Sequence, residues 1–341
     1  MKDQIPFISI IIPCRNEEKC IEHCLQSILT NIPAGAGLEI LVIDGVSNDR
    51  TKLIVSEIIK EHTNIKLLDN PAKIQAAGMN IGIKAAKGDI IVRLDAHSEY
   101  GHTYIKDCVD LLLKSDAVNA GGRLVTIPNG NGIMGVPFSR ITSHPFGVGH
   151  APFRTGAAAK FVDTVPFGTF KRSIFDQVGY YDERLTRNED NEFNSRIVKA
   201  GYKIAFDPAI EIIYKHQSRL KGILFHTFYS SMWNVYDFFL HPHVWRTKRF
   251  IPLLFLIYIL LLGILGPLLP PLLFLIMGTP LLFYIGLISW ASFSPKYDLK
   301  TNLLTFVTFF VYHMTYGFGI LVGLLQIITG GWKNQLGKPV R

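Results

Sequence analysis

The stretch Asp89–Tyr100, "DIIVRLDAHSEY", ends an apolar run in side chains that can bind a metal ion. Asp95 and His97 are two positions apart, and on an extended chain such residues point to the same side. A carboxylate and a neutral imidazole can therefore face one divalent ion. Imidazole suits Mn²⁺ better than Mg²⁺, which prefers oxygen. The alternative is a strand-end aspartate beside a hydrogen-bonded histidine, and the tripeptide alone does not separate the two.

Buried strands and helices alternate around that stretch. Continuous apolar, β-branched runs predict strands at residues 7–14, 38–44, 65–69 and 89–95. Helices are predicted after each of the first three strands, the first of them capped by Asn16. The alternation predicts an α/β fold in which residues 7–125 form a doubly wound, mostly parallel sheet.

Ligands of such sheets bind beyond the carboxyl ends of the strands. The groups that end three of the strands are Pro13–Arg15, Asp44 and Asp95–His97, so we expect them to line one crevice. A dinucleotide-binding domain needs a glycine-rich turn after its first strand. The turn "PCRNEEK" has no glycine, which argues against a redox enzyme of that class.

The charged residues divide the chain unevenly, because all but six of them lie before Phe250. The net charge is +8, and basic residues gather just ahead of the apolar region. That position favours anionic lipid headgroups over nucleic acid, so we expect membrane lipids and no nucleic acid among the partners. The opening apolar stretch is too short for a signal or a span and is broken by Pro6 and Pro13. We therefore expect an integral membrane protein whose soluble part, residues 1–215, is cytoplasmic.

The C-terminal part predicts two kinds of membrane segment. Residues 216–249 are rich in aromatics and begin with cations, which is typical of an amphipathic helix in the interface. Residues 250–341 predict an α-helical transmembrane region of about three spans, because one span takes about 20 residues. The spans are expected at 250–269, 271–293 and 303–328.

Three spans would place the basic tail, Lys333, Lys338 and Arg341, outside the cell, although basic residues usually stay inside. A snorkelling tail and a re-entrant hairpin at the proline-broken residues 266–271 are the two alternatives.

Five segments together resemble a family 2 glycosyltransferase with the GT-A fold. In family order and spacing over about residues 7–215, they are "ISIIIPCRNEEKCIEHCLQSI", "VIDGVSNDRT", "NPAKIQAAGMNIGIKAAKGDIIVRLDAH", "VPFGTFKRSIFDQVGYYDE" and "NEDNEFNSRIVKAG". Asp-Ala-His and the loop "HPFGVGHAPFRTG" are similar to the membrane-associated succinoglycan-biosynthesis type. In two departures from the common pattern, Gly45 stands where most members have a second Asp, and His97 replaces the last carboxylate.

The resemblance implies the catalytic roles. Asp95 and His97 would hold the ion that neutralises the departing diphosphate, as in the Asp-x-His motif of the polypeptide N-acetylgalactosaminyltransferases. Asp190 would be the general base, with Glu189 beside it near the acceptor. For these two acidic residues the alternative is the start of a capped, solvated helix.

The resemblance also implies a nucleotide-sugar site. Its residues are Pro13, Arg15, Asp44, Lys73, Asn80 and Asp95. Asp44 would accept a hydrogen bond from the ring N–H of the base, which favours uridine. Lys73 would lie near the diphosphate, or else be a solvated loop lysine, and Glu17 would contact the donor or serve as a helix-start carboxylate. Arg154 and His150, in the loop rich in Gly, Pro and aromatics, are candidates for contact with the donor or the acceptor, and the sequence alone does not decide this.

The implied function is a metal-dependent, inverting hexosyltransferase at the cytoplasmic face of the membrane. It would move a sugar from a nucleotide-sugar donor, UDP-linked by expectation, to a lipid-linked saccharide in surface polysaccharide or glycan assembly. Mn²⁺ is expected in preference to Mg²⁺. The alternatives are a polyprenyl-phosphate sugar synthase and a non-catalytic membrane scaffold with the same fold.

Overall fold

A computed structural model describes residues 6–30, 37–130, 132–149, 151–244 and 246–339 of the chain. The chain divides into two compact units. Unit 1 comprises Met1–Val125, Ala151–Lys215 and Gln335–Arg341, and unit 2 comprises Thr126–His150 and His216–Asn334. Thr126–His150, which lies within the predicted soluble part, residues 1–215, therefore groups with the C-terminal helices, and Gln335–Arg341 groups with unit 1.

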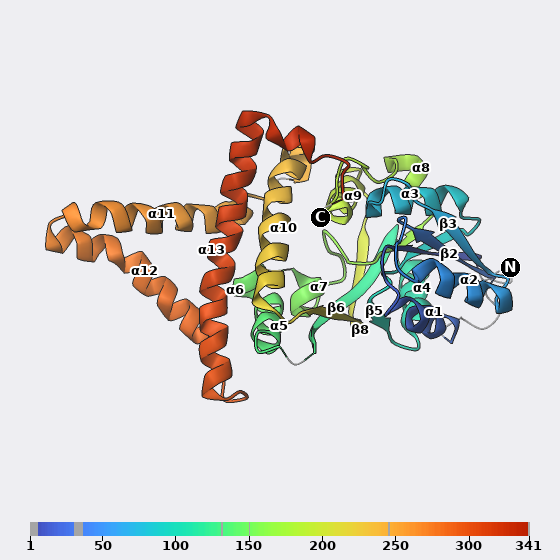
Figure 1. The fold of residues 1–341 in the computed structure, drawn as a ribbon, viewed down its shortest axis with the longest axis horizontal. Helices are drawn as coiled ribbons and strands as arrows, with labels where there is room; N and C mark the ends of the chain where they lie inside the picture. The colour runs from blue at the N-terminus through green and yellow to red at the C-terminus, as the bar shows by residue number, and fades with distance from the viewer. Residues whose placement is uncertain (1–5, 31–36, 131, 150, 245, 340–341) are drawn as a thin grey trace. The chain divides into compact units, whose positions relative to one another are not determined.

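Within the described residues the sheet has eight strands in the order β3-β2-β1-β4-β7-β6-β8-β5 (Figure 1). Their bounds are β1 Ile8–Cys14, β2 Leu38–Asp44, β3 Ile65–Asp69, β4 Ile90–Arg93, β5 Ser98–Tyr100, β6 Asn119–Asn129, β7 Thr169–Lys171 and β8 Ile204–Gln217. β1 to β4 pair in parallel and form the doubly wound part that the sequence predicted. β7 pairs antiparallel with β4 and β6, and β5 pairs antiparallel with β8, so the complete sheet is mixed.

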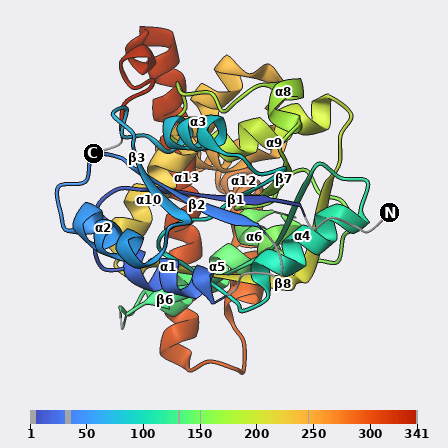
Figure 2. The same ribbon diagram turned by 90° about the vertical axis from the view of Figure 1, so that its right-hand side faces the viewer.

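Helices cover both faces of the parallel strands (Figure 2). One face carries α1 Ile21–Leu29, α2 Thr51–Glu61 and α4 Tyr104–Lys114, and the other carries α3 Gln75–Ala85, α8 Ile174–Val178 and α9 Glu189–Lys199. A shorter helix, α7 Pro152–Thr155, belongs to the same unit. Successive residues of β1 alternate between two hydrophobic cores, Ile10 and Ile12 entering one and Ile11 the other. This is why the strand is a continuous apolar run.

Unit 2 consists mainly of helices. Their bounds are α5 Gly135–Ser143, α6 Pro145–Val148, α10 Leu220–Leu240, α11 Ile251–Leu265, α12 Pro271–Ser292 and α13 Leu299–Thr329, with 3₁₀ turns at η1 Pro242–Val244, η2 Thr247–Phe250, η3 Gly266–Leu268 and η4 Gly331–Asn334. α10 lies in the predicted interface region, and α13 begins four residues before the predicted third span.

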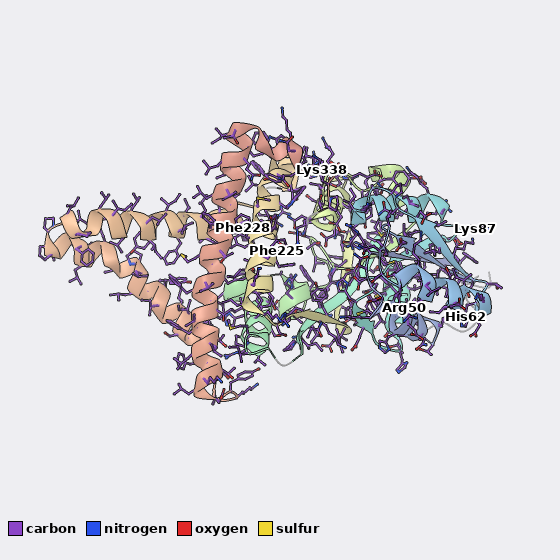
Figure 3. All side chains as sticks on the ribbon, in the orientation of Figure 1. Arg50, His62, Lys87, Phe225, Phe228 and Lys338 are labelled. Carbon is purple, nitrogen blue, oxygen red and sulfur yellow. The ribbon has the colours of Figure 1, made fainter. Side chains whose placement is uncertain are left out.

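α10 and α13 lie side by side along their lengths (Figure 1). A Cβ atom added to Gly319 of α13 would come within 2.5 Å of the Phe228 carbonyl oxygen of α10. Phe228 also contacts Phe318, with ring centroids 5.8 Å apart (Figure 3). Small residues on α13 therefore allow its backbone to approach that of α10.

Three helical segments are long and apolar enough to cross a membrane, as judged by length and composition. They are Thr247–Leu268, Pro271–Ser292 and Leu299–Thr329. α11 and α12 form a hairpin that extends sideways from α13 (Figure 1). Most side chains of this hairpin project with no other segment of the chain beside them (Figure 3).

Candidate active site

The parallel strands bring the predicted site residues to one edge of the sheet. Cys14, at the end of β1, is in register with Asp44, at the end of β2. β4 ends at Arg93, which pairs with Ile11 of β1. The residues after Arg93 therefore bring Asp95 to the level at which β1 ends. The crevice groups expected from the sequence meet there.

Hydrogen bonds join the turns that follow β1 and β2. The Asn16 amide N–H donates to Ser47 Oγ at 2.9 Å, and the Asn48 N–H donates to Asn16 Oδ1 at 2.9 Å. The Glu17 N–H donates to Thr51 Oγ1 at 2.8 Å. α1 begins only at Ile21, so the prediction that Asn16 caps it is wrong. Asn16 instead fixes one turn against the other and thereby positions Glu17.

Strained backbone concentrates around the predicted site. The non-glycine residues with positive φ include four beside or within it, namely Asn16, Val46, Lys73 and Asn188. Their φ values lie between 56° and 64°, in the left-handed region that such residues rarely occupy. Strain of this kind persists where the surrounding structure holds it, and it clusters at functional sites.

His97 is held by Glu17. Its Nδ1 lies 3.1 Å from Glu17 Oε1, so Nε2 is the nitrogen that can take a metal ion. The His97 side chain is 39% exposed, which leaves part of the ring accessible. The Glu17 carboxylate raises the pKa of His97 above its usual value, although burial opposes this effect. Glu17 thus orients the imidazole and favours its protonated form.

Asp95 is held from two sides. Gln75 Nε2 donates to Asp95 Oδ1 at 3.0 Å. The Tyr100 hydroxyl accepts the Asp95 amide N–H at 2.7 Å and donates to the Asp95 carbonyl oxygen at 3.2 Å. The carboxylate is therefore oriented by Gln75, and its backbone by Tyr100.

A buried arginine links this carboxylate to the start of α9. Arg93 Nη2 lies 3.1 Å from Glu189 Oε1, and Arg93 Nε lies 3.9 Å from Asp95 Oδ1. Arg93 and Glu189 are each 4% exposed. We did not predict a role for Arg93, although the sequence carries a signal for it. It is a cation within an apolar strand run, two positions before Asp95, and so belongs to the same alternating set as Asp95 and His97.

Glu189 and Asp190 occupy the first turn of α9. Burial raises the pKa of Glu189 to about 7, although Arg93 opposes the shift. Asp190 is only partly buried, and its Oδ1 accepts the N–H of the neighbouring Asn191 at 2.8 Å. The helix start that we kept as an alternative is present, but Glu189 within it is buried rather than solvated.

Asp44 has one carboxylate oxygen unused. Its Oδ2 accepts the Ser47 N–H at 2.9 Å. Its Oδ1 is buried and has no hydrogen-bond partner among the described residues. A Cβ at Gly45 would lie 3.2 Å from Arg15 Cβ, so glycine fits closely at the position where most members carry a second Asp. The unused oxygen is an acceptor for a donor that the chain does not supply.

The remaining nucleotide-site candidates differ in their surroundings. Arg15 and Lys73 are exposed, in the loops after β1 and β3, and Pro13 is the penultimate residue of β1. Asn80 has partners within the chain: its Nδ2 donates to the Tyr181 carbonyl oxygen at 2.9 Å, and its Oδ1 accepts the Tyr181 N–H at 2.9 Å. Both ends of the amide therefore hold the segment after α8, which favours a supporting role over direct contact with the nucleotide.

Tyr214 of β8 completes the surroundings of His97. The two rings meet edge to face, with centroids 5.6 Å apart. Arg154 and Arg187 both interact electrostatically with the Tyr214 hydroxyl and lower its pKa, which burial raises. Arg154, which we expected to face the donor or acceptor, is thus near the site, and His150 lies outside the described residues. Tyr214 gave no sequence signal, because it reaches the site only through the pairing of β8 with the distant strand β5. Arg187 lies in the segment just before α9, and no local pattern marked it.

The donor set around Asp95 and His97 fits a divalent ion that also binds a ligand. The two side chains offer one carboxylate and one imidazole. Among the described residues, no third His, Cys, Asp or Glu forms a cluster with both in which all ligand atoms lie within 4.8 Å of one another. An ion held here would keep positions for ligand oxygens and water, as ions that bind phosphates commonly do.

Comparison with known proteins gives one family and several relatives. The model of the family described as "Glycosyl transferase family 2" matches residues 9–179. Succinoglycan biosynthesis protein ExoA of Rhizobium meliloti is 27% identical over 247 residues, which are 72% of this chain and 74% of that protein.

A second relative is the dolichyl N-acetyl-alpha-D-glucosaminyl phosphate 3-beta-D-2,3-diacetamido-2,3-dideoxy-beta-D-glucuronosyltransferase of Methanococcus voltae. It is 29% identical over 225 residues, which are 64% of this chain and 70% of that protein. Among solved structures, the mannosyltransferase PcManGT from Pyrobaculum calidifontis, in complex with GDP-Man and Mn²⁺, has a TM-score of 0.63. It covers 95% of this chain and 87% of its own at 14% identity, which is a likeness of fold.

Proposed function

We propose that this chain, which belongs to glycosyl transferase family 2, transfers a sugar from a nucleotide-sugar donor to a lipid-linked saccharide with inversion at the anomeric carbon. One observation carries the proposal: Arg93 lies between Asp95, on the donor side, and Glu189, the neighbour of Asp190. A single displacement needs a group that supports the leaving diphosphate and a base for the nucleophile within one site. The buried ion pairs keep these two groups in a fixed relation.

Asp190 is proposed as the general base. Its carboxylate takes the proton of an acceptor hydroxyl while that oxygen bonds to the anomeric carbon of the donor. The bond between the anomeric carbon and the diphosphate breaks in the same step, and the nucleoside diphosphate leaves. Glu189 and Arg93 act behind Asp190, positioning the start of α9.

Asp95 and His97 are the proposed ligands of a divalent ion, Mn²⁺ in preference to Mg²⁺ because of the imidazole. When bound, the ion supplies positive charge to the departing diphosphate. The chain contributes the orientation of the ligands through Glu17, Gln75 and Tyr100. PcManGT, which shares the fold, was solved with Mn²⁺.

The nucleotide is proposed to lie along the ends of β1 and β2. The unused Oδ1 of Asp44 suits the ring N–H of uracil, so we expect a UDP-sugar. Pro13 and Arg15 would flank the nucleotide, and Arg15 and Lys73 are exposed cations available to its phosphates. Arg154 is close enough to Tyr214, whose ring contacts His97, to interact with it electrostatically.

A lipid-linked saccharide is the proposed acceptor. The names of the two curated relatives refer to succinoglycan biosynthesis and to a sugar carried on dolichyl phosphate. The apolar C-terminal helices would keep the chain at the membrane where such lipids present their head groups. We infer a cytoplasmic catalytic domain that acts in surface polysaccharide or glycan assembly.

The test is turnover by the purified full chain in detergent, with a panel of nucleotide sugars, extracted membrane lipids, and Mn²⁺ or Mg²⁺. We expect the sugar of a UDP-sugar to be transferred to a lipid that already carries a diphosphate-linked saccharide, rather than released by hydrolysis. The transfer should be faster with Mn²⁺ than with Mg²⁺. A monophosphate-linked sugar lipid as product would instead identify a polyprenyl-phosphate sugar synthase. Metal-dependent turnover that is unchanged in His97→Ala would contradict the role of His97.

A further inference from the structure

We propose that the α11–α12 hairpin is the only part of the described chain that crosses into the hydrocarbon core of the membrane. α13 then lies in the interface, on the side of the membrane where unit 1 is. α13 has the length and composition of a membrane span. Whether it crosses the membrane is therefore judged from the contacts that it makes. The proposal concerns topology and holds whatever reaction the site performs.

The side of the membrane is set by the chain before the hairpin. In the described residues, no helix that is long and apolar enough to cross begins before Thr247. α5, α6 and α10 all precede that residue and are joined to the strands of the sheet by short connections. These three helices therefore share one side of the membrane with the sheet.

The first half of α13 is bound by these helices. Arg140 of α5 donates from Nη1 to Asn302 Oδ1 at 3.0 Å and to Thr305 Oγ1 at 3.1 Å. Eleven residues after Asn302, about three turns further along α13, His313 Nε2 lies 3.2 Å from the carbonyl oxygen of Phe146 in α6. Arg140 is charged, so its position marks the N-terminal part of α13 as lying outside the hydrocarbon core.

The second half of α13 and the residues after it are bound on the same side. Asn234 of α10 donates to the Tyr316 hydroxyl at 2.9 Å. After α13 ends, the Gly337 N–H donates to the Arg184 carbonyl oxygen at 2.9 Å, within unit 1. Thr186 Oγ1 donates to the carbonyl oxygen of Lys338 at 2.8 Å (Lys338 is labelled in Figure 3).

These contacts cannot all form if α13 crosses the bilayer. From Asn302 to Thr329 the helix rises about 40 Å, which exceeds the hydrocarbon thickness of about 30 Å. A spanning α13 would put one end on the far side, away from either Arg140 or Arg184. Partners from the chain before Thr247 hold both ends, so both ends lie on one side.

The exposed surfaces match this arrangement. The exposed large apolar residues of α13 recur at helical spacing along one face: Leu299, Leu303, Val307, Phe310, Phe318, Leu325 and Ile328. A helix with one apolar face suits the plane of the interface. In contrast, α11 and α12 expose apolar side chains on most of their surface, among them Leu254, Ile264, Leu272, Leu275 and Phe283. A helix that is apolar all round suits the hydrocarbon core.

The charge distribution agrees as well. A hairpin enters and leaves the membrane through one face, so α13 alone decides the side of the residues that follow it. With α13 in the interface, Lys296, Lys300, Lys333 and Lys338 all lie with the basic residues that precede the hairpin. The positive-inside trend, which three spans violate, is then satisfied.

The test is labelling of single cysteines with a membrane-impermeant maleimide in right-side-out and inside-out vesicles from a bacterial host. Lys333→Cys, after α13, is the informative variant, and Lys60→Cys on α2 reports the side of unit 1; both lysines are exposed. Both are made in a Cys20→Ser background, because the other three native cysteines are buried. We expect Lys60→Cys and Lys333→Cys to label in the same vesicle preparation.

Two control positions make the result decisive. Lys296→Cys, between α12 and α13, should label with Lys60→Cys, and Leu268→Cys, at the tip of the hairpin, should not label from that side. Labelling of Lys333→Cys only in the opposite preparation would overturn the proposal, as would labelling of Leu268→Cys from the unit 1 side. If a cysteine variant does not accumulate, a topology reporter fused after residue 341 shows on which side of the membrane that end lies. A reporter on the side opposite Lys60 counts against the proposal.

Discussion

Glu17 and His97, 80 positions apart in the chain, are joined by a contact of 3.1 Å between Oε1 and Nδ1. Glu17 comes from the turn after β1, and His97 from the turn after β4, so the contact connects two strand ends of the parallel sheet. It answers the question left by the sequence about Glu17. The carboxylate neither caps α1 nor stands apart from the proposed metal site, because it orients one of the two ligands.

Replacing Glu17 should change how metal binding depends on pH. A histidine binds metal only when neutral, and Glu17 raises the pKa of His97. Metal affinity should therefore begin to fall, on acidification, above the usual histidine range. In Glu17→Gln the midpoint should move to lower pH, while affinity at high pH falls about 10-fold or more because the ring loses its orienting partner. Mn²⁺ binding followed by electron paramagnetic resonance measures both effects. Glu22→Gln, exposed on α1, is the control, and an unchanged midpoint in Glu17→Gln would count against the assignment.

Removing Arg93 should destabilise unit 1. Arg93→Met leaves Glu189 buried without its cation, and breaking a buried ion pair from one side costs about 3–5 kcal/mol. Thermal unfolding in detergent should show a large loss of stability, and Arg50→Met, at an exposed position (Figure 3), should show little. The double variant Arg93→Met with Glu189→Gln should recover part of the loss, because no uncompensated carboxylate remains. Additive effects of the two changes would mean that the pair is not coupled.

Asp190→Asn should abolish most turnover without loss of donor binding. General base catalysis contributes about 10²–10⁴-fold, so kcat should fall by that order. The dissociation constant of the nucleoside diphosphate should stay within twofold, since Asp190 is proposed to act on the acceptor. Asp176→Asn, exposed on α8, is the matched control. Turnover near that of the unsubstituted chain would exclude Asp190 as the base.

Glu189 should make stability depend on pH. Its pKa is raised from 4.5 to about 7, first of all by burial, so the folded chain binds this proton more tightly than the unfolded chain. Its contribution to the unfolding free energy is complete below about pH 4.5 and is lost as the pH rises to about 7. In the unsubstituted chain this loss lowers the melting temperature at pH 7 relative to that at pH 5. In Glu189→Gln this contribution is absent, so the melting temperature at pH 7 should rise relative to that at pH 5. An exposed carboxylate variant, Glu57→Gln, should keep the original difference.

Asn80→Ala should lower stability and leave donor binding intact. The change leaves the N–H and the carbonyl oxygen of Tyr181 without partners, which costs about 1–3 kcal/mol. Thermal unfolding should report that loss, and the KM for the donor should stay within twofold. Lys87→Ala, exposed just after α3 (Figure 3), serves as the comparison. A KM raised tenfold with unchanged stability would restore the nucleotide-binding role first expected for Asn80.

The parallel half of the fold could be predicted because each of its strands carries the whole signal locally. β1 and β2 are covered on both faces, so their sequences are unbroken apolar runs. β5 and β7 have three residues each, too few for a pattern, and their places in the sheet depend on pairing with distant strands. The antiparallel half was accordingly not foreseen.

The site residues, like the strands, divide into those that the sequence could predict and those that it could not. Asp44 ends β2, and Asp95 and His97 closely follow the end of β4, so their place at one edge of the sheet followed from topology. The contact of Arg93 with Glu189 spans 96 positions, and that of Asn80 with Tyr181 spans 101. No local spacing encodes partners at such separations. The sequence therefore located strand-end groups well, but it could not assign the buried polar residues that support them.

The hydrogen bond between Thr186 and Lys338 joins positions 152 apart, and both hairpin helices are encoded between them. A ribosome that has completed the sheet has not yet made this partner. The segment that ends three residues before α9 thus receives its final contacts only after the hairpin has been synthesised and has left the ribosome. A nascent chain that stops within the hairpin therefore lacks the partner of Thr186.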